Sequence, residues 1–140
     1  MNNLERFVKA QENDYYTALN EIRAGHKVSH WMWYIFPQLK GLGKSSMSSY
    51  YGIEDGNEAL QYYQHPILGQ RLIEISKALL QLPEELTSLD IFGSIDSWKL
   101  KSCMTLFFQV SNDEVFNNVL IKFYDGRKDQ RTMSKLNNDQ

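Results

Sequence analysis

Apolar side chains recur every three or four residues along most of this chain, which is the spacing of one face of an α-helix. The first such series predicts a helix over residues 3–24. Its members are Leu4, Phe7, Val8, Tyr15, Leu19 and Ile22. The same spacing predicts a helix over residues 66–81, a helix that begins at Asp96, and a helix capped by Asn112 or Asp113. A chain with this periodicity builds its core by packing helix against helix.

Shorter helices are expected between the long ones, because Gly and Pro interrupt the apolar pattern. They are placed near residues 29–35, 45–51, 56–63, 83–89 and 129–136, with a connector at 91–95. A strand is the rival interpretation of residues 31–36, since aromatic residues favour strands, but no second segment offers it a partner. The predicted fold is therefore all-α, a single compact orthogonal bundle of about seven helices, several of them short.

Residues 30–52 contain more chemically varied side chains than packing alone requires. His30 and Tyr34 are one helical turn apart and share a face, whereas Trp33 points elsewhere, so one side can pack inward while another lines a cleft. Aromatic side chains beside an imidazole suit the stacking of a planar ring, although core packing uses the same residues. His30 is the candidate acid or base, with Asp96 to orient it, and the alternative is a structural histidine.

The loop at residues 41–45, with sequence GLGKS, is similar to a phosphate-binding loop, in which backbone N–H groups and a lysine hold phosphate oxygens. The full motif needs a further glycine at position 38, where this chain has Gln38. A weaker anion site remains, formed by Lys44 and the backbone N–H groups of residues 45–47. The alternative is an ordinary glycine turn with a solvated lysine.

A second polar cluster lies in the helix expected from Asp96. It consists of Asp96, Lys99, Lys101, Ser102 and Thr105. Lys99 and Ser102 are three residues apart and share one face of that helix. If this face turns toward the glycine loop, the two segments together form an anion site. The alternative is a capped helix start exposed to solvent.

Charge and cysteine content limit the classes of function. The formal net charge of −2 argues against nucleic-acid binding. A single cysteine, Cys103, and the absence of a signal peptide at the start predict a cytoplasmic protein. The longest apolar run, residues 31–37, is far shorter than the ~20 residues of a membrane span. His26 and His30 lack the glutamate of a zinc-protease motif, so no metal site is predicted.

Five motifs extend over nearly the whole chain: LERFVKAQ, KVSHWMWYIFPQLKGLGKSS, HPILGQRL, FGSIDSWKLKSCMTLF and FYDGRKDQRT. They resemble the DUF1810 family, a small bacterial all-α domain whose biochemical function is unassigned. The resemblance implies the fold and one DUF1810-like domain over residues 1–140, with an ordered core of about 3–136, but no activity. Similar sequences usually read Ser-Ser-Met-Thr where this chain has Cys103 after Ser102, which weakens any role that requires the second serine.

Polar residues interleaved with aromatic residues and glycines predict a pocket for an anionic, ring-bearing ligand such as a nucleotide or an ADP-ribose-like compound. The expected ligand-binding residues are Trp33, Gln38, Lys44, Ser45, Lys99 and Ser102. His30 and Asp96 are the candidate catalytic residues, and no cofactor is expected. One alternative is a non-catalytic protein-interaction domain that uses exposed Trp and Tyr. A weaker alternative is nucleic-acid binding through the lysine-bearing glycine loop.

Overall fold

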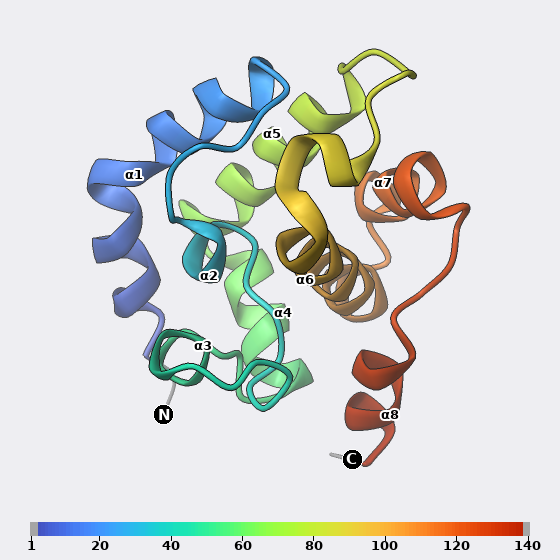
Figure 1. Ribbon diagram of the computed structural model, residues 1–140. Coiled ribbons are helices and arrows are strands. Elements are labelled where there is room, and N and C mark those ends of the chain that lie inside the picture. Colours follow the sequence, from blue (N-terminus) through green and yellow to red (C-terminus); the bar gives the residue numbers. More distant parts are fainter. Residues whose placement is uncertain (1–2, 139–140) are drawn as a thin grey trace.

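The computed structural model describes residues 3–138, which fold into eight α-helices (Figure 1). These are α1 (Glu5–Arg23), α2 (Met32–Ile35), α3 (Ser46–Tyr50), α4 (Gly56–Gln64), α5 (Leu68–Leu80), α6 (Ser88–Ser111), α7 (Glu114–Tyr124) and α8 (Gln130–Asn138). Within this range the only strand-like pairing is an isolated bridge between Leu39 and Ile53. The prediction of an all-α fold is confirmed, with eight helices where about seven were expected. Over the same residues, no helix is both long and apolar enough to cross a bilayer.

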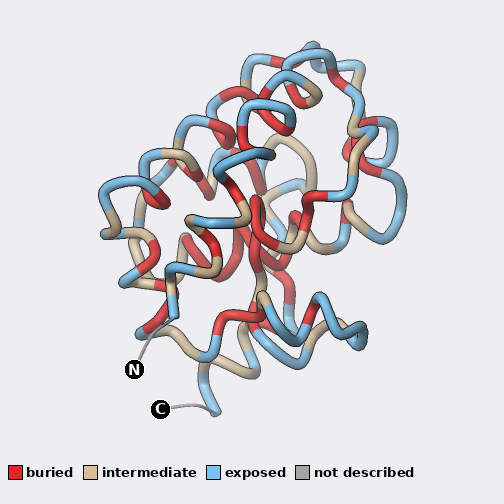
Figure 2. The backbone as a smooth tube through the Cα atoms, turned by 90° about the vertical axis from the view of Figure 1, so that its left-hand side faces the viewer, coloured by how far each residue is buried: buried red, intermediate tan, exposed pale blue. Residues whose placement is uncertain are grey.

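Helix α6 lies near the centre of the molecule (Figure 1). It packs against α7 and α4, while α1 and α7 both pack against α5. Figure 2 shows that the buried stretches of these helices face one another in the interior. Every residue from 102 to 107, in the middle of α6, is buried. Burial of one Leu or Phe side chain contributes about 1.5–3 kcal/mol, so the packing of helix against helix is the main source of stability.

The segment between α1 and α2 is held by one carboxylate, that of Glu21. This carboxylate accepts hydrogen bonds from the backbone N–H groups of Val28 (2.8 Å) and Ser29 (2.9 Å), the Ser29 hydroxyl (2.6 Å) and the Trp31 indole (2.9 Å). Burial raises the pKa of the carboxyl, but the four hydrogen bonds outweigh it and lower the pKa to about 2. Because Ser29 binds Glu21, it does not cap α2, which begins at Met32 and not near residue 29 as predicted.

Two backbone hydrogen bonds join the start of the loop between α2 and α3 to Ile53, which follows α3. The Lys40 N–H donates to the Ile53 carbonyl (2.8 Å), and the Ile53 N–H donates to the Gln38 carbonyl (2.9 Å). A Cβ at Gly43 would lie 2.4 Å from the hydroxyl oxygen of Ser48, so only glycine fits at this position. The predicted order of helix, glycine loop and helix is confirmed.

Helix α6 begins earlier than predicted, because Thr87 caps it and Asp96 does not. The Thr87 hydroxyl accepts from the Asp90 N–H (3.1 Å), and the Asp90 carboxylate accepts from the Thr87 N–H (3.0 Å), which makes a capping box. Gly93, with a φ of 80°, kinks the helix where a connector was expected. The short helix predicted over residues 83–89 is wrong, because those residues form a turn and then enter α6.

Helix α8 lies at one edge of the molecule and packs against α6 (Figure 1). An irregular stretch leads to it from the end of α7. The prediction that a last helical segment starts at Asp129 is confirmed, because α8 begins at the next residue. The N-terminal end of α8 therefore lies against the second half of α6.

Candidate functional site

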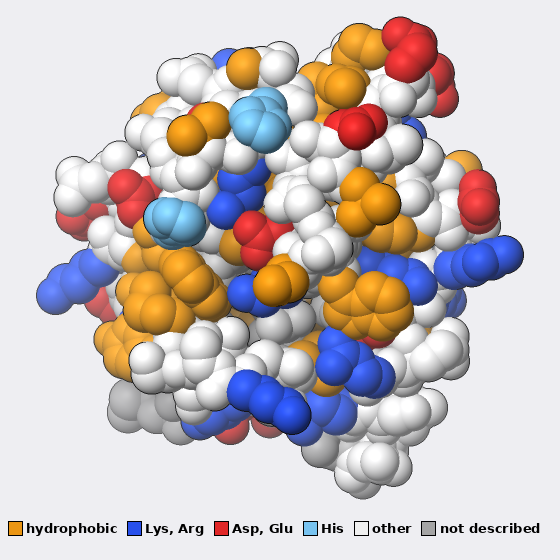
Figure 3. Space-filling model, in the orientation of Figure 1, with side chains coloured by type: hydrophobic (Ala, Val, Ile, Leu, Met, Phe, Trp, Pro, Cys, Tyr) orange, Lys and Arg blue, Asp and Glu red, His pale blue; other side chains and the backbone are white. Residues whose placement is uncertain are grey.

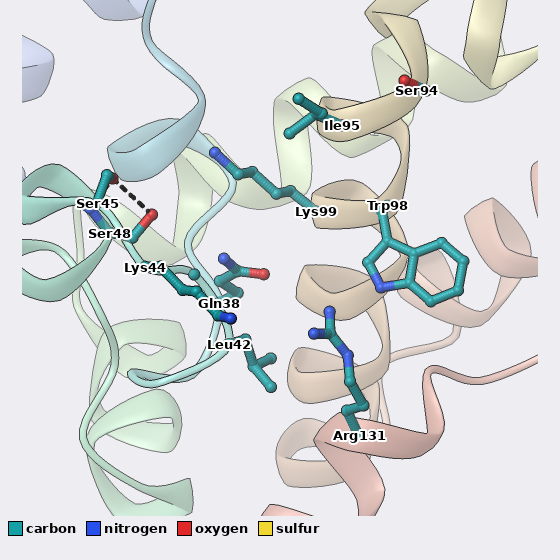
Figure 4. A pocket seen from close by; sticks show the side chains of 11 residues that line it. Gln38, Leu42, Lys44, Ser45, Ser48, Ser94, Ile95, Trp98, Lys99 and Arg131 are labelled. Atoms are coloured by element: carbon teal, nitrogen blue, oxygen red, sulfur yellow. Dashed lines mark hydrogen bonds between the residues drawn. The ribbon is translucent and has the colours of Figure 1, made fainter.

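A cleft lies between the glycine loop and the part of α6 that directly follows Gly93, with α8 at its edge (Figure 4). Its volume is about 680 Å³, and small-molecule sites typically occupy roughly 300–1,000 Å³. The lining residues are Gln38, Leu42, Gly43, Lys44, Ser45, Ser48, Ser94, Ile95, Trp98, Lys99 and Arg131. We call this cavity the Trp98 cleft.

Three cationic side chains reach the Trp98 cleft from three separate elements. Lys44 belongs to the glycine loop, Lys99 to α6 and Arg131 to the first turn of α8. No Asp or Glu is among the lining residues. Within residues 3–138, Lys44 and Arg131 form no salt bridge. The cleft is therefore electropositive, and Figure 3 shows Lys and Arg side chains lying between hydrophobic ones over the lower part of this face.

Lys99 differs from the other two cations because, among residues 3–138, it has an aspartate carboxylate within salt-bridge distance. Its ammonium lies 3.9 Å from the Asp96 carboxylate and 5.4 Å from the centre of the Trp33 ring. The other oxygen of Asp96 lies 2.9 Å from the Lys27 ammonium, so a single carboxylate is shared between two lysines. Asp96 therefore neutralises the charge of Lys99 only in part, and the edge of the cleft stays positive.

Trp98 forms an apolar wall of the cleft. Its side chain is 51% exposed, and Figure 4 shows Leu42 on the other side of the cavity. The guanidinium carbon of Arg131 lies 5.8 Å from the centre of the Trp98 ring, and the Lys101 ammonium lies 5.1 Å from it. A half-exposed indole next to cations can stack on a planar ring that carries negative groups.

The polar groups of the cleft lie mainly on the glycine-loop side. The Gln38 side chain extends into the cavity, where its carboxamide offers both a donor and an acceptor (Figure 4). The Ser45 hydroxyl accepts from the Ser48 N–H (3.0 Å) and donates to the Ser48 hydroxyl (3.1 Å), which fixes the start of α3. The hydroxyl oxygen of Ser48 can still accept a further hydrogen bond.

Most of the predicted ligand-binding residues lie together. Those that line the Trp98 cleft are Gln38, Lys44, Ser45 and Lys99. Trp33 lies beside it, in a small hollow that also borders Gln38 and Lys99. Ser102 is not in the cleft, because it faces the interior, is 0% exposed and donates a hydrogen bond to Asp129 (2.9 Å).

The two candidate catalytic residues are not brought together. The His30 side chain is exposed and does not line the Trp98 cleft. Asp96 binds Lys27 and Lys99, so its carboxylate is directed to lysines and not to an imidazole. His30 therefore does not share the Trp98 cleft with Lys44.

The part of the chain that the structure describes contains neither a metal centre nor an exposed thiol. Across residues 3–138, no group of three or more His, Cys, Asp or Glu side chains converges as a metal site would require. Cys103 is buried, and burial raises the pKa of its thiol, so it remains protonated.

Sequence reasoning missed several lining residues: Leu42, Ser48, Ser94, Ile95, Trp98 and Arg131. For Trp98 a signal was present, because Ile95 lies one turn earlier and both have polar neighbours, which indicates an exposed amphipathic surface. Arg131 gave no local signal, because its nearness to Trp98 depends on how α8 docks on α6.

Comparisons with known proteins support the fold but supply no activity. The model of the family described as "Protein of unknown function (DUF1810)" matches residues 1–136. The crystal structure of the conserved hypothetical protein Rv1873 from Mycobacterium tuberculosis is 43% identical in sequence and superposes with a TM-score of 0.93. That match covers 96% of each chain. No curated protein matches the sequence.

Proposed function

We propose that the chain, which belongs to the DUF1810 family, binds a small anionic ligand with a planar ring in the Trp98 cleft. A nucleotide or an ADP-ribose-like compound has this chemistry. One observation carries the proposal, namely that Lys44, Lys99 and Arg131 meet at one cavity that has an indole wall and no carboxylate lining.

The charges of the cleft support an anionic ligand. Bringing three cations together without a lining carboxylate costs electrostatic free energy, which a bound anion relieves. Arg131 can hold two phosphate oxygens at once through its planar guanidinium, whereas Lys44 acts as a point charge. Because these two side chains lie on different elements, a ligand that contacts both must sit inside the cleft (Figure 4).

The uncharged part of the lining supports a planar ring. The half-exposed Trp98 ring offers aromatic surface for stacking, and Leu42 and Ile95 add apolar surface. Gln38 supplies a donor and an acceptor that match the edge of a heterocyclic base. A simple inorganic anion would leave this apolar surface and the carboxamide unused.

A thermal-shift comparison tests the proposal. Wild-type protein is heated with ADP, with a sugar phosphate and with adenosine, which lacks phosphate. The variants are Lys44→Gln and Arg131→Gln, and the matched control is Lys9→Gln, which removes an exposed lysine of α1 outside the cleft. A ligand at 100 times its Kd adds about 2.7 kcal/mol to the unfolding free energy, which raises the Tm by several degrees.

The expected result is stabilisation by ADP in the wild type and in Lys9→Gln, with a smaller effect in Lys44→Gln and Arg131→Gln. Adenosine should stabilise little, because it cannot neutralise the cations. No stabilisation by any phosphorylated compound at millimolar concentration, or equal stabilisation of all four proteins, would contradict the proposal.

A second candidate function is a non-catalytic protein interaction through exposed side chains. The observation that favours it is that Ile95 and Trp98, one turn apart at the edge of the cleft, are 72% and 51% exposed. Large apolar side chains in such positions are common in binding interfaces. Affinity purification with wild type and with Trp98→Ala separates the two functions: a partner lost from the variant, with no response to ADP in the thermal shift, favours the interaction.

A further inference from the structure

A buried carboxylate lies two residues before Arg131 and outside the Trp98 cleft. Asp129 is 1% exposed, and one of its oxygens accepts hydrogen bonds from the Ser102 hydroxyl (2.9 Å), the Thr132 hydroxyl (2.5 Å) and the Thr132 N–H (3.1 Å). The Asp129 N–H donates to the Thr105 hydroxyl (2.9 Å). Ser102, Thr105 and Thr132 are all 0% exposed. Asp129 therefore joins the start of α8 to the middle of α6 through buried polar contacts.

The partners of Asp129 lie on the same stripe of α6 as the indole of the cleft. Trp98, Ser102 and Thr105 follow one another at spacings of four and three residues, so they share one face of the helix. The Ser102 hydroxyl also lies 3.3 Å from the Trp98 carbonyl. Asp129 contacts this face of α6 at Ser102, and Arg131 lies near Trp98 on the same face. One hydrogen-bond network thus sets where α8 lies along α6.

Apolar packing of α8 is limited, although Leu136 packs against the core. Thr132 is the one buried residue among residues 130–138, and the apolar side chains of Met133 and Leu136 are only partly buried. A helix with so little apolar burial depends on its polar anchor for its position. Buried networks of this kind are specific in geometry, because each unpaired member would carry a desolvation cost.

We propose that Asp129 is the positioning residue of the Trp98 cleft, holding Arg131 over the Trp98 ring by fixing the first turn of α8 to Ser102 and Thr105. The part that concerns ligand affinity rests on the proposed function. Ser102 then contributes to the site through Asp129 and does not touch the ligand.

A measurement without ligand tests the positioning directly. The protein is labelled with 5-fluorotryptophan, and its ¹⁹F NMR spectrum is recorded, with the Trp98 signal identified by its loss in Trp98→Phe. Asp129→Ala should move the Trp98 signal in the same direction as Arg131→Gln and by at least half as much. The double variant should move it no further than Arg131→Gln does, and the signal of Trp31 should stay in place.

A milder pair of variants guards against loss of folding. Ser102→Ala removes a donor to Asp129, and Ser111→Ala is its matched control. Both hydroxyls belong to α6 and lie within hydrogen-bond distance of the carbonyl four residues earlier, but the further partner of Ser111 is the Asp113 N–H, outside α8. Ser102→Ala should shift the Trp98 signal, and Ser111→Ala should not. If Asp129→Ala does not fold, this pair decides the question.

Titration with ADP provides the second arm of the test. Asp129→Ala and Ser102→Ala should weaken ADP binding, with Asp129→Ala losing about as much as Arg131→Gln, roughly tenfold or more. In a protein that carries Arg131→Gln, adding Asp129→Ala or Ser102→Ala should not weaken ADP binding further. An unmoved Trp98 signal in Asp129→Ala and Ser102→Ala, or additive losses in the double variants, would overturn the positioning role. If wild-type protein does not bind ADP, the proposed function fails, and the ¹⁹F comparison still decides the role of Asp129.

Discussion

Replacing Glu21 by Gln should destabilise the segment that leads from α1 into α2. The variant keeps the side-chain shape but loses the charge and one of the two acceptor oxygens. The backbone N–H groups of Val28 and Ser29, the Ser29 hydroxyl and the Trp31 indole would then share a neutral acceptor. Hydrogen bonds to a neutral group are weaker than those to a carboxylate, so the free energy of unfolding should fall.

The pKa of Glu21 gives the size of this effect. An ordinary glutamate has a pKa of about 4.3, and the folded protein lowers that of Glu21 to about 2. At about 1.36 kcal/mol per pKa unit the full shift corresponds to about 3 kcal/mol. Because this carboxylate is partly exposed, solvent screening reduces the expected contribution to about 1–2 kcal/mol. Folding lowers the pKa, so the contribution is complete above pH ~5 and is lost as the pH falls toward 2.

Urea unfolding followed by helical circular dichroism measures this contribution. We expect Glu21→Gln to be less stable than the wild type by about 1–2 kcal/mol at pH 7, and by about half as much at pH 3. Glu12→Gln, at an exposed position of the same helix, is the control and should change little. Equal stability of Glu21→Gln and wild type at pH 7, or a difference that stays constant down to pH 3, would refute the reasoning.

Three further substitutions have distinct expected outcomes. Trp98→Ala should lower the unfolding free energy by less than about 1 kcal/mol in urea but weaken ADP binding about 5- to 150-fold by calorimetry, since loss of stacking costs roughly 1–3 kcal/mol; unchanged affinity would contradict the stacking role. Gly69→Ala should destabilise the protein by about 1–3 kcal/mol in thermal unfolding, because the new Cβ would lie 1.9 Å from the Tyr63 carbonyl oxygen; an unchanged Tm would refute this close approach. Lys122→Met should speed amide exchange at the end of α5, where its ammonium now binds three backbone carbonyls, and unchanged exchange would show that these bonds are dispensable.

The helices followed from the sequence where the apolar spacing is regular over many residues. Residues 5–23 and 68–80 form helices within the ranges that their periodicity predicts. The start of α6 was misplaced because Gly93 reads as a break, although Thr87 and Asp90 already carried the capping-box pattern upstream. Gly93 does interrupt the helical backbone, and the helical parts before and after it both contribute buried residues to the core, which local spacing does not reveal.

The candidate site was predictable where its residues are close in sequence. Gln38 and Lys44 are close in sequence, lie in one loop and line one cavity. Ser102 was assigned to the ligand because it shares a helical face with Lys99. Its buried position follows from Asp129, which lies far along the chain, and no spacing rule links the two. Arg131 was not predicted for the same reason, since its nearness to the cleft depends on how α8 packs against α6.

Titration of ADP into ¹⁵N-labelled protein, followed by two-dimensional NMR, tests most directly whether the Trp98 cleft binds an anionic, ring-bearing ligand. The indole N–H of Trp98 and the side-chain N–H of Arg131 should shift together and saturate. The indole N–H of Trp31, which binds Glu21 away from the cleft, should not shift. Spectra unchanged at millimolar ADP, or shifts confined to residues outside the cleft, would contradict this account.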